Sequence, residues 1–397
     1  MKKLMACVLS LALTVSFSAC QAGPSGSSAG GDTGASAQNS AASGETIKIG
    51  VVTPLTGQTS SFGQSAKKGL ELLEEQVNSA GGINGQKVDF LVQDDEGKAA
   101  TAVTVGQKLI NSDKVVAIVG PLTSTCANSL APICQQYQVP MVTGTGTNTK
   151  ITEAGDFIFR TCFIDPFQGQ VMAKFASEDL KAKTAAILFN NGDDYSKGLA
   201  EAFKSNFTSK GGRIVAEETY NTGDKDFNAQ LTKIAPKKPD VMFLPDYYST
   251  VAVIAKEARS AGVKATFLGG DGWDSSELFS IGGDAVNGVY FSNHYAADDT
   301  AKEVVQFIKD YKAKYSNTVP DAMAALNYDA GKVLLESIKK AGSTDANAIK
   351  EALKSYDGTV VSGHIKFNEK RDAVKAAVII KTVDGKEKFF KKIQPDA

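Results

Sequence analysis

Short apolar segments alternate with amphipathic segments from residue 47 onward, and this alternation constrains the fold more than any other feature of the chain. Residues 115–119 form a continuous apolar run, which is typical of a parallel strand covered on both faces. Leu70, Leu73 and Val77 recur at helical spacing and predict a helix over residues 62–79. Gly81 and Gly82 follow and end it. The chain therefore reads as an α/β protein.

The alternation occurs in two blocks. The first predicts strands over 47–52, 88–92 and 115–119, with helices over 62–79, 99–111 and from about residue 123. The second begins after residue 166 and predicts strands over 185–189, 214–218, 241–244, 266–268 and 289–291, with helices starting near 194, 226, 247 and 275. Helices are expected again over 301–315, 322–341 and 347–355, before terminal strands. Two such blocks predict two doubly wound lobes, which bind ligands at the carboxyl ends of their strands.

Composition excludes several classes of function. Lys plus Arg number 43 and Asp plus Glu number 44, so no charge excess favours nucleic acid. The chain has two histidines, His294 and His364, and no His-x-x-x-His or Cys-x-x-Cys spacing, which argues against zinc. A lone histidine is more often structural than catalytic. We expect no metal and no cofactor.

The five cysteines do not indicate a disulfide scaffold. Cys7 lies in the apolar leader, and Cys20 ends it. Cys126 and Cys134 would lie roughly 12 Å apart along a shared helix, too far to bridge. Whether Cys162 pairs with either depends on the fold and stays open.

The first 44 residues predict where the protein works. Lys2 and Lys3 precede an apolar run over 4–17 and the small residues 18–19, as in a secretory signal, here residues 1–20. The run is shorter than the roughly 20 residues of a membrane-spanning helix. Residues 17–20, Phe-Ser-Ala-Cys, resemble a bacterial lipobox, which predicts lipid on Cys20 and an anchored extracytoplasmic protein; the alternative is plain secretion. Residues 21–44 are rich in Gly, Ser and Ala and predict a disordered tether.

Six loops that follow predicted strands could carry the site. They are 53–63, 120–125, 143–148, 190–195, 245–249 and 269–274. Thr123 and Ser124 open a helix, where free N–H groups and hydroxyls suit an anion, although such residues also serve simply as caps. Loop 143–148 is Thr or Gly at five of six positions and could be only a flexible loop. Asp271 lies among glycines beside Trp273, the only Trp, and could pair with a cation or simply occupy a surface turn.

These loops offer no nucleophile with a base. A Ser–His–Asp set would need His294 or His364, and nothing in the sequence places either beside a candidate serine. Hydroxyls, glycines, aromatic rings and one or two carboxylates suit binding a zwitterion with an apolar part. We therefore expect a binding protein and not an enzyme.

The motifs together resemble the branched-chain amino-acid-binding proteins of bacterial ABC importers. The resemblance spans nearly all of residues 45–394. It is carried by segments 47–57, 80–85, 119–121, 160–161, 193–198, 224–227 and 267–273.

That family has two Rossmann-like lobes joined by three hinge crossings, closing on the ligand like a clamshell. The resemblance places the crossings near Ile164, His294 and Ala376. It implies lobe 1 from residues 45–163 and 295–375, and lobe 2 from residues 164–294 and 376–397. It further implies a monomer that binds an aliphatic amino acid and delivers it to the permease subunits.

The resemblance also implies roles for individual residues. In lobe 1, the ligand carboxylate would meet Ser124 and Thr147, the ammonium would meet the carbonyl of Thr145, and Phe62 would close over the ligand. In lobe 2, Tyr195 and Tyr247 would face the ligand, and Asp271 would pair with its ammonium.

Two departures from the family leave the amino acid open. Asp271 stands where the family often has Glu, and Trp273 could reshape the side-chain pocket. A two-lobed sensor of amino acids or amides remains an alternative, as does a secreted enzyme, although no catalytic set supports it. Affinity, the permease partner and the type of bacterial envelope are not determined by the sequence.

Overall fold

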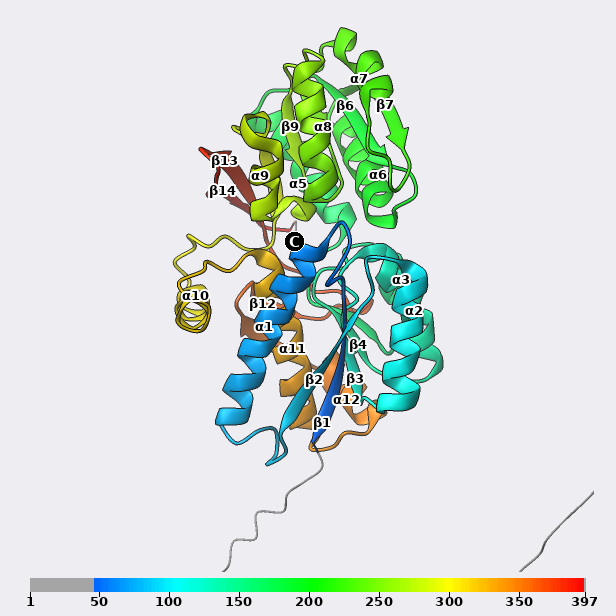
Figure 1. The fold of residues 1–397 in the computed structure, drawn as a ribbon, viewed down its shortest axis with the longest axis vertical. Coiled ribbons are helices and arrows are strands. Elements are labelled where there is room, and N and C mark those ends of the chain that lie inside the picture. Colours follow the sequence, from blue (N-terminus) through cyan, green and yellow to red (C-terminus); the bar gives the residue numbers. More distant parts are fainter. Residues whose placement is uncertain (1–45, 396–397) are drawn as a thin grey trace, which may run out of the picture. The chain divides into compact units, whose positions relative to one another are not determined.

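The computed structural model describes residues 46–395, all within one compact unit, residues 42–397. Two sheets dominate it (Figure 1). The first has five parallel strands, which we call the lobe 1 sheet. Its strands, in spatial order, are β2 (Val88–Asp94), β1 (Ile47–Thr53), β3 (Ala117–Val119), β4 (Met141–Thr143) and β5 (Ile158–Arg160).

Helices cover both faces of the lobe 1 sheet because side chains alternate along its strands. Ile49 and Val51 point to one core, which is shared with α1 (Ser60–Ser79) and α11 (Ala322–Ala341). Val52 and Ile118 point to the other core. The helices on that second face are α2 (Ala99–Lys108), α3 (Ser124–Gln136) and α4 (Lys150–Glu153).

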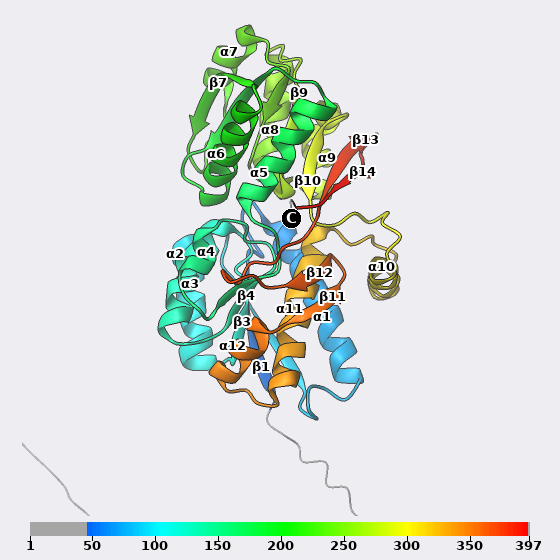
Figure 2. The same cartoon turned by 180° about the vertical axis from the view of Figure 1, so that it is seen from behind.

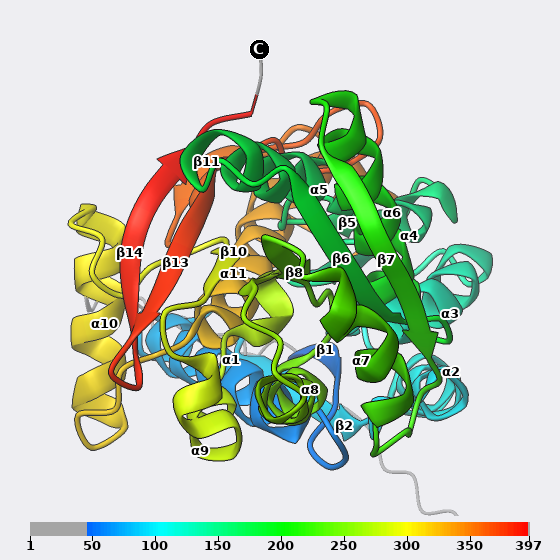
Figure 3. The same ribbon diagram turned by 90° about the horizontal axis from the view of Figure 1, so that it is seen from above.

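The second sheet, the lobe 2 sheet, has seven strands and an antiparallel edge (Figure 3). In spatial order the strands are β14 (Lys386–Ile393), β13 (Ala377–Val383), β10 (Tyr290–Asn293), β9 (Thr266–Gly269), β8 (Val241–Phe243), β6 (Thr184–Asn190) and β7 (Arg213–Tyr220). One face packs on α7 (Asn228–Ile234), α8 (Tyr248–Ser260) and α9 (Ser276–Gly282). The other packs on α5 (Asp165–Lys174) and α6 (Asp194–Ser209), seen from behind in Figure 2.

The chain passes between the two sheets three times. It leaves lobe 1 after β5 and enters α5, and it leaves lobe 2 after β10 to form α10 (Lys302–Lys314), α11 and α12 (Ala346–Lys354). A two-stranded sheet, β11 (Asp357–Val360) with β12 (Gly363–Lys366), precedes the return to β13. Three crossings make each lobe discontinuous in sequence, as the resemblance implied.

Most predicted elements lie within a few residues of the observed ones, but three differences have clear causes. The strand predicted over 115–119 begins at Ala117, because the helix before it ends in a π-helical turn (Leu109–Asp113) and Val115 N–H bonds to Leu109 O. β4 and β5 were not predicted, because each has only three residues, too few to show a periodic pattern of apolar side chains.

Of the N-terminal predictions, the leader, Cys20 and the tether lie outside the described residues. Within the described residues, no helix is long and apolar enough to cross a membrane.

A buried arginine fixes the loop after β4, which carries Thr145 and Thr147. Arg160 Nε donates to Asp372 Oδ1, and its Nη1 donates to Gly146 O at 2.9 Å and Asn148 O at 2.8 Å. Its Nη2 donates to Thr152 Oγ1 at 3.1 Å. The guanidinium is fully buried, and the planar group satisfies carbonyls that would otherwise lose their contact with water.

We predict that Asp372→Ala lowers the free energy of unfolding by about 3–5 kcal/mol, because it leaves the Arg160 charge buried without its carboxylate. Urea unfolding followed by circular dichroism measures the loss. Glu351→Ala, which removes an exposed ion pair with Lys354 on α12, is the matched control and should change stability by less than about 0.5 kcal/mol. A loss below about 1 kcal/mol for Asp372→Ala would show that the pair does not hold the loop.

Candidate functional site

The predicted site residues lie at the carboxyl ends of parallel strands of both sheets. Lobe 1 contributes Phe62 on α1 after β1, Ser124 at the start of α3 after β3, and Thr145 after β4. Lobe 2 contributes Tyr195 on α6 after β6, Tyr247 just before α8, and Asp271 after β9. Strand ends facing one another across two doubly wound lobes form the usual crevice for a ligand.

A small cavity lies where these residues meet. Its volume is about 10 Å³. It is lined by Phe62, Leu122, Ser124, Thr145, Tyr195, Tyr247, Asp271, Gly272 and Met323. Space of this size holds about one water molecule, so any larger ligand requires the walls to move apart.

The cavity has an apolar wall and a polar wall. Phe62, Leu122 and Met323 supply the apolar wall, and Phe62 also packs on Tyr247 of lobe 2 with ring centroids 6.1 Å apart. Ser124 and Asp271 supply polar groups from opposite lobes. The arrangement suits a small molecule with a charged end and an apolar end.

Ser124 is the first residue of α3, where backbone N–H groups lack helical partners. Its hydroxyl accepts a hydrogen bond from Asn148 N at 3.2 Å, which joins the two lobe 1 loops. The hydroxyl of Thr145 donates to Leu122 O at 2.7 Å and ties the same loops together. This corner therefore offers N–H groups and a hydroxyl, which suit an anion, on two loops that are hydrogen-bonded to each other.

Asp271 is the acidic group of the polar wall and is 3% exposed. Tyr195 donates its hydroxyl to Oδ1 at 2.8 Å, and His294 Nε2 lies 3.0 Å from Oδ2. Burial, and then the nearby carboxylate, raises the pKa of Tyr195 well above its usual value, so Tyr195 remains a donor. Among the described residues Asp271 has no ion pair with Lys or Arg. A buried carboxylate held only by neutral donors favours a cationic ligand group.

Two other buried acids of lobe 2, Asp165 and Asp246, do not line this cavity. Burial raises the pKa of Asp165 to about 8 and that of Asp246 to about 7. Both carboxyls therefore take up protons near neutral pH and are weaker partners for a cation. Asp246 also accepts hydrogen bonds from Tyr220 and from Tyr247 N.

The structure does not bring two of the predicted site residues to the cavity. Thr147 is buried beside it, and its carbonyl accepts from Asp165 N at 3.0 Å. Trp273 lies in the lobe 2 core against Gly269, with its indole N–H donating to Leu244 O at 3.0 Å. The indole is buried in this core, and Trp273 does not line the cavity. The structure therefore shows no contact by which Trp273 would reshape the side-chain pocket.

Sequence reasoning missed three residues that the structure places at the site. Leu122 lies in the Ser124 loop and could have been found by its position. Met323 opens α11, roughly 200 residues further along the chain, and no local pattern points to it. His294 was assigned a structural role because it is a lone histidine, and its proximity to Asp271 exists only in the fold.

Hydrogen bonds between the lobes hold the cavity closed. Thr125 Oγ1 donates to Asp193 Oδ2 at 2.8 Å, and Asn128 Nδ2 donates to Asp194 Oδ2 at 2.7 Å. On the other side of the cavity, the hydroxyl oxygen of Ser61 lies 2.9 Å from that of Ser275. Apolar packing adds to these polar contacts, because Phe62 of lobe 1 lies against Tyr247 and Tyr248 of lobe 2 with ring centroids 6.1 and 4.9 Å apart.

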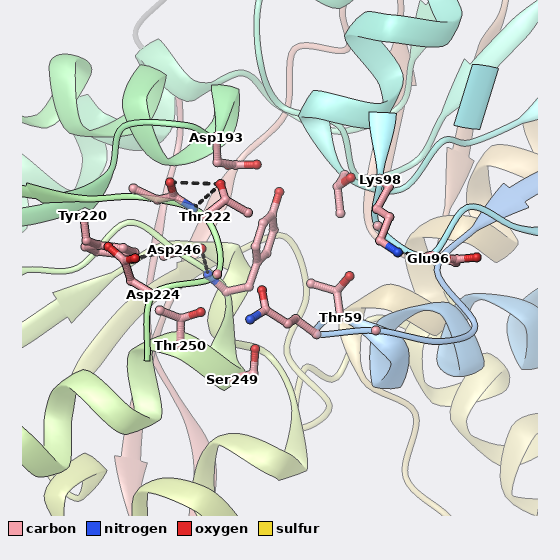
Figure 4. Close-up of a pocket in the computed structure, with 17 residues that line it drawn as sticks. Thr59, Glu96, Lys98, Asp193, Tyr220, Thr222, Asp224, Asp246, Ser249 and Thr250 are labelled. Atoms are coloured by element: carbon pink, nitrogen blue, oxygen red, sulfur yellow. Dashed lines mark hydrogen bonds and ion pairs between the residues drawn. The ribbon is translucent and has the colours of Figure 1, made fainter. Parts of the chain in front are cut away.

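A larger polar cavity of about 230 Å³ adjoins the small one and shares Tyr247 with it. Figure 4 shows Asp193, Tyr220 and Asp246 of lobe 2 on one side, facing Glu96 and Lys98 of lobe 1 on the other. Its acids already accept hydrogen bonds, including those from Thr125 to Asp193 and from Tyr220 to Asp246. This cavity, like the small one, is lined by residues of both lobes.

The described residues contain no group of three or more His, Cys, Asp or Glu side chains that could hold a metal ion. Cys126, Cys134 and Cys162 are all buried and free, so the disulfide left open by the sequence is not formed. Cys126 and Cys134 do share α3.

Two α/β lobes with a small cavity between their strand ends define a two-lobed solute-binding protein. Residues 46–388 match the family model described as periplasmic binding protein, and the chain belongs to that family. Its members bind solutes and are not enzymes.

Relatives and solved structures of this family are similar over most of the chain. A Leu/Ile/Val-binding protein homolog from Brucella melitensis is 33% identical over 349 residues, covering 86% of this chain and 92% of the relative. The structure of a leucine-binding protein, LivK, from Thermotoga maritima is 36% identical, with a TM-score of 0.84 and coverage of 88% and 99%. The Streptococcus pneumoniae LivJ in complex with isoleucine is 31% identical, with a TM-score of 0.83 and coverage of 88% and 100%.

Proposed function

We propose that the protein captures an aliphatic amino acid between its lobes and delivers it to the permease of an ABC importer. The observation that carries this proposal is that the cavity has polar groups from both lobes on one side and apolar side chains on the other. A carboxylate would lie at Ser124 and the start of α3, an ammonium at Asp271, and an aliphatic side chain against Phe62, Leu122 and Met323. Relatives named for leucine, isoleucine and valine support this choice.

Asp271 is the group that selects an amino acid over a simple carboxylic acid. A ligand without a cation would leave this buried carboxylate with neutral donors alone, whereas an ammonium compensates its charge. Asp is one methylene shorter than Glu, so the ammonium has to approach the lobe 2 loop more closely. We propose ligand contacts for Thr145 and Thr147 as well. Both lie on the loop after β4, whose carbonyls accept hydrogen bonds from Arg160.

Binding requires the lobes to open, because about 10 Å³ cannot hold an amino acid. The few polar contacts between the lobes can break and re-form around the ligand. A ligand in this place touches both lobes and so stabilises the closed form relative to the open one. Such closure gives a permease a surface that differs between the loaded and the empty protein.

We predict that a thermal-shift screen finds an aliphatic amino acid that raises the unfolding temperature, and that Ser124→Ala and Asp271→Asn then weaken its binding about tenfold or more in calorimetry. Each change removes a hydrogen bond or charge partner worth roughly 1.5–3 kcal/mol. Ser129→Ala on the same helix and Asp284→Asn on the surface of lobe 2 are the matched controls and should bind normally.

Two results would contradict this assignment. If no amino acid or small amide stabilises the wild-type protein, the proposed function fails. If Asp271→Asn binds within two- or threefold of wild type, the ammonium lies elsewhere.

We also propose that the mature protein is a monomer held at the outer face of the cell membrane by lipid on Cys20. The lipobox-like residues 17–20 and the Gly/Ser/Ala-rich stretch after them support this anchor.

We predict that mass spectrometry of the mature N-terminus shows a diacylated or triacylated Cys20, and that Cys20→Ser releases the protein from the membrane fraction. An unmodified wild-type protein cleaved elsewhere would refute the anchor.

A further inference from the structure

Two of the three hinge crossings meet at Asp271. Gln168 lies on α5, the first helix after the chain enters lobe 2, and its Oε1 accepts from Asp271 N at 2.8 Å. His294 follows β10, where the chain leaves lobe 2, and its Nε2 lies 3.0 Å from Asp271 Oδ2. The backbone and the carboxylate of Asp271 are thus held from separate crossings.

His294 is itself held rigidly. Its ring stacks on Phe163, which lies in the first crossing, with centroids 3.5 Å apart and planes 20° from parallel. The residue is 3% exposed. The stacking fixes the plane of the ring, and within that plane Nε2 lies toward Asp271.

The hydrogen bonds assign the protonation of this ring. Nδ1 is buried with no partner among the described residues, whereas Nε2 faces a carboxylate oxygen, which can only accept. The proton therefore lies on Nε2. Burial lowers the pKa of His294 to about 4, against the opposing effect of Asp271, so the ring is neutral at physiological pH. The charged groups that act on it are Asp271 and Lys375.

We propose that His294, as a neutral Nε2–H donor, is a positioning residue that aims the Asp271 carboxylate at the ligand ammonium. A carboxylate offers about four acceptor positions, and His294 and Tyr195 occupy one on each oxygen. The remaining positions are left for the ammonium. A neutral donor orients the carboxylate without cancelling its charge, which an imidazolium or a lysine in this place would do.

This inference rests on the proposed function and adds a determinant of it outside the cavity wall. It also links the site to the hinge. Gln168 lies four residues after the first crossing and His294 lies at the second, so the support of Asp271 is built where lobe 2 joins lobe 1.

The binding test compares His294→Leu with His294→Gln in the mature protein. Leu has no donor, whereas the Gln side-chain amide can place an N–H near the position of Nε2. With the best amino acid from the screen, His294→Leu should bind about tenfold more weakly and His294→Gln within about threefold of wild type, on the scale of a hydrogen bond to a charged group. His364→Leu is the control, because His364 lies on the exposed β11–β12 hairpin and should bind as wild type.

A second measurement does not need a ligand. With only two histidines, a His364→Gln variant leaves one imidazole, whose ¹⁵N chemical shifts report its tautomer and charge. His294 should remain the neutral Nε2–H form between about pH 5 and 8, and Asp271→Asn should shift its resonances.

Three results would overturn the proposal: titration of His294 near its ordinary pKa, an Nδ1–H tautomer, or His294→Leu binding as tightly as wild type. The proposal would also be overturned if His294→Gln bound the ligand as weakly as His294→Leu. If His294→Leu does not fold, the Gln variant and the NMR measurement decide. If the wild type binds no amino acid at all, the positioning role falls with the proposed function, while the NMR result still shows whether the hydrogen bond exists.

Discussion

A buried carboxylate without a cationic partner is the interaction on which the site depends. Asp271 lies at the end of β9 and is held by a phenol, an imidazole and the side chain of Gln168, none of which carries charge. Burying this carboxylate costs desolvation free energy, which a cationic group of the ligand would offset. Opposite it, the start of α3 offers N–H groups and the Ser124 hydroxyl. The two ends of the proposed site therefore have opposite electrostatic preferences and lie on different lobes, an arrangement that would suit a ligand with both charges.

The surrounding structure keeps these two ends in place and still lets them separate. Within lobe 1, the fully buried Arg160 and the Thr145 hydroxyl fix the loops that carry the anion site. Within lobe 2, Trp273 and Tyr195 pack the Asp271 loop against the core. Between the lobes the contacts are hydrogen bonds such as Thr125 to Asp193, each worth about 1 kcal/mol net, and the packing of Phe62 on Tyr247 and Tyr248. Strong contacts within lobes and weak contacts between them favour rotation about the hinge over distortion of the site.

The strand and helix pattern predicted the architecture well, because long periodic segments such as residues 47–53 and 322–341 carry their own signal. It placed the loops that carry Ser124, Thr145, Tyr195, Tyr247 and Asp271 at strand ends, and the family resemblance singled out these residues within the loops. It could not predict that Trp273 turns into the core, since the choice between core and cavity depends on a contact with Gly269 that has no local signal. Met323 and His294 were missed for the same reason: each reaches the site only through the three chain crossings.

The central claim, that the ligand enters and binds between the lobes, is tested most directly by locking them together. The hydroxyl oxygens of Ser61 and Ser275 are 2.9 Å apart across the lobes, so the pair Ser61→Cys and Ser275→Cys can form a disulfide with a small adjustment. In a variant that lacks the leader and Cys20, the remaining cysteines are Cys126, Cys134 and Cys162; all three are buried, and burial raises the pKa of their thiols, so they should not compete. The account predicts that the oxidised double variant, with the bridge confirmed by mass spectrometry, no longer takes up ligand in calorimetry and that a reductant restores binding. Undiminished binding by the bridged protein would contradict it.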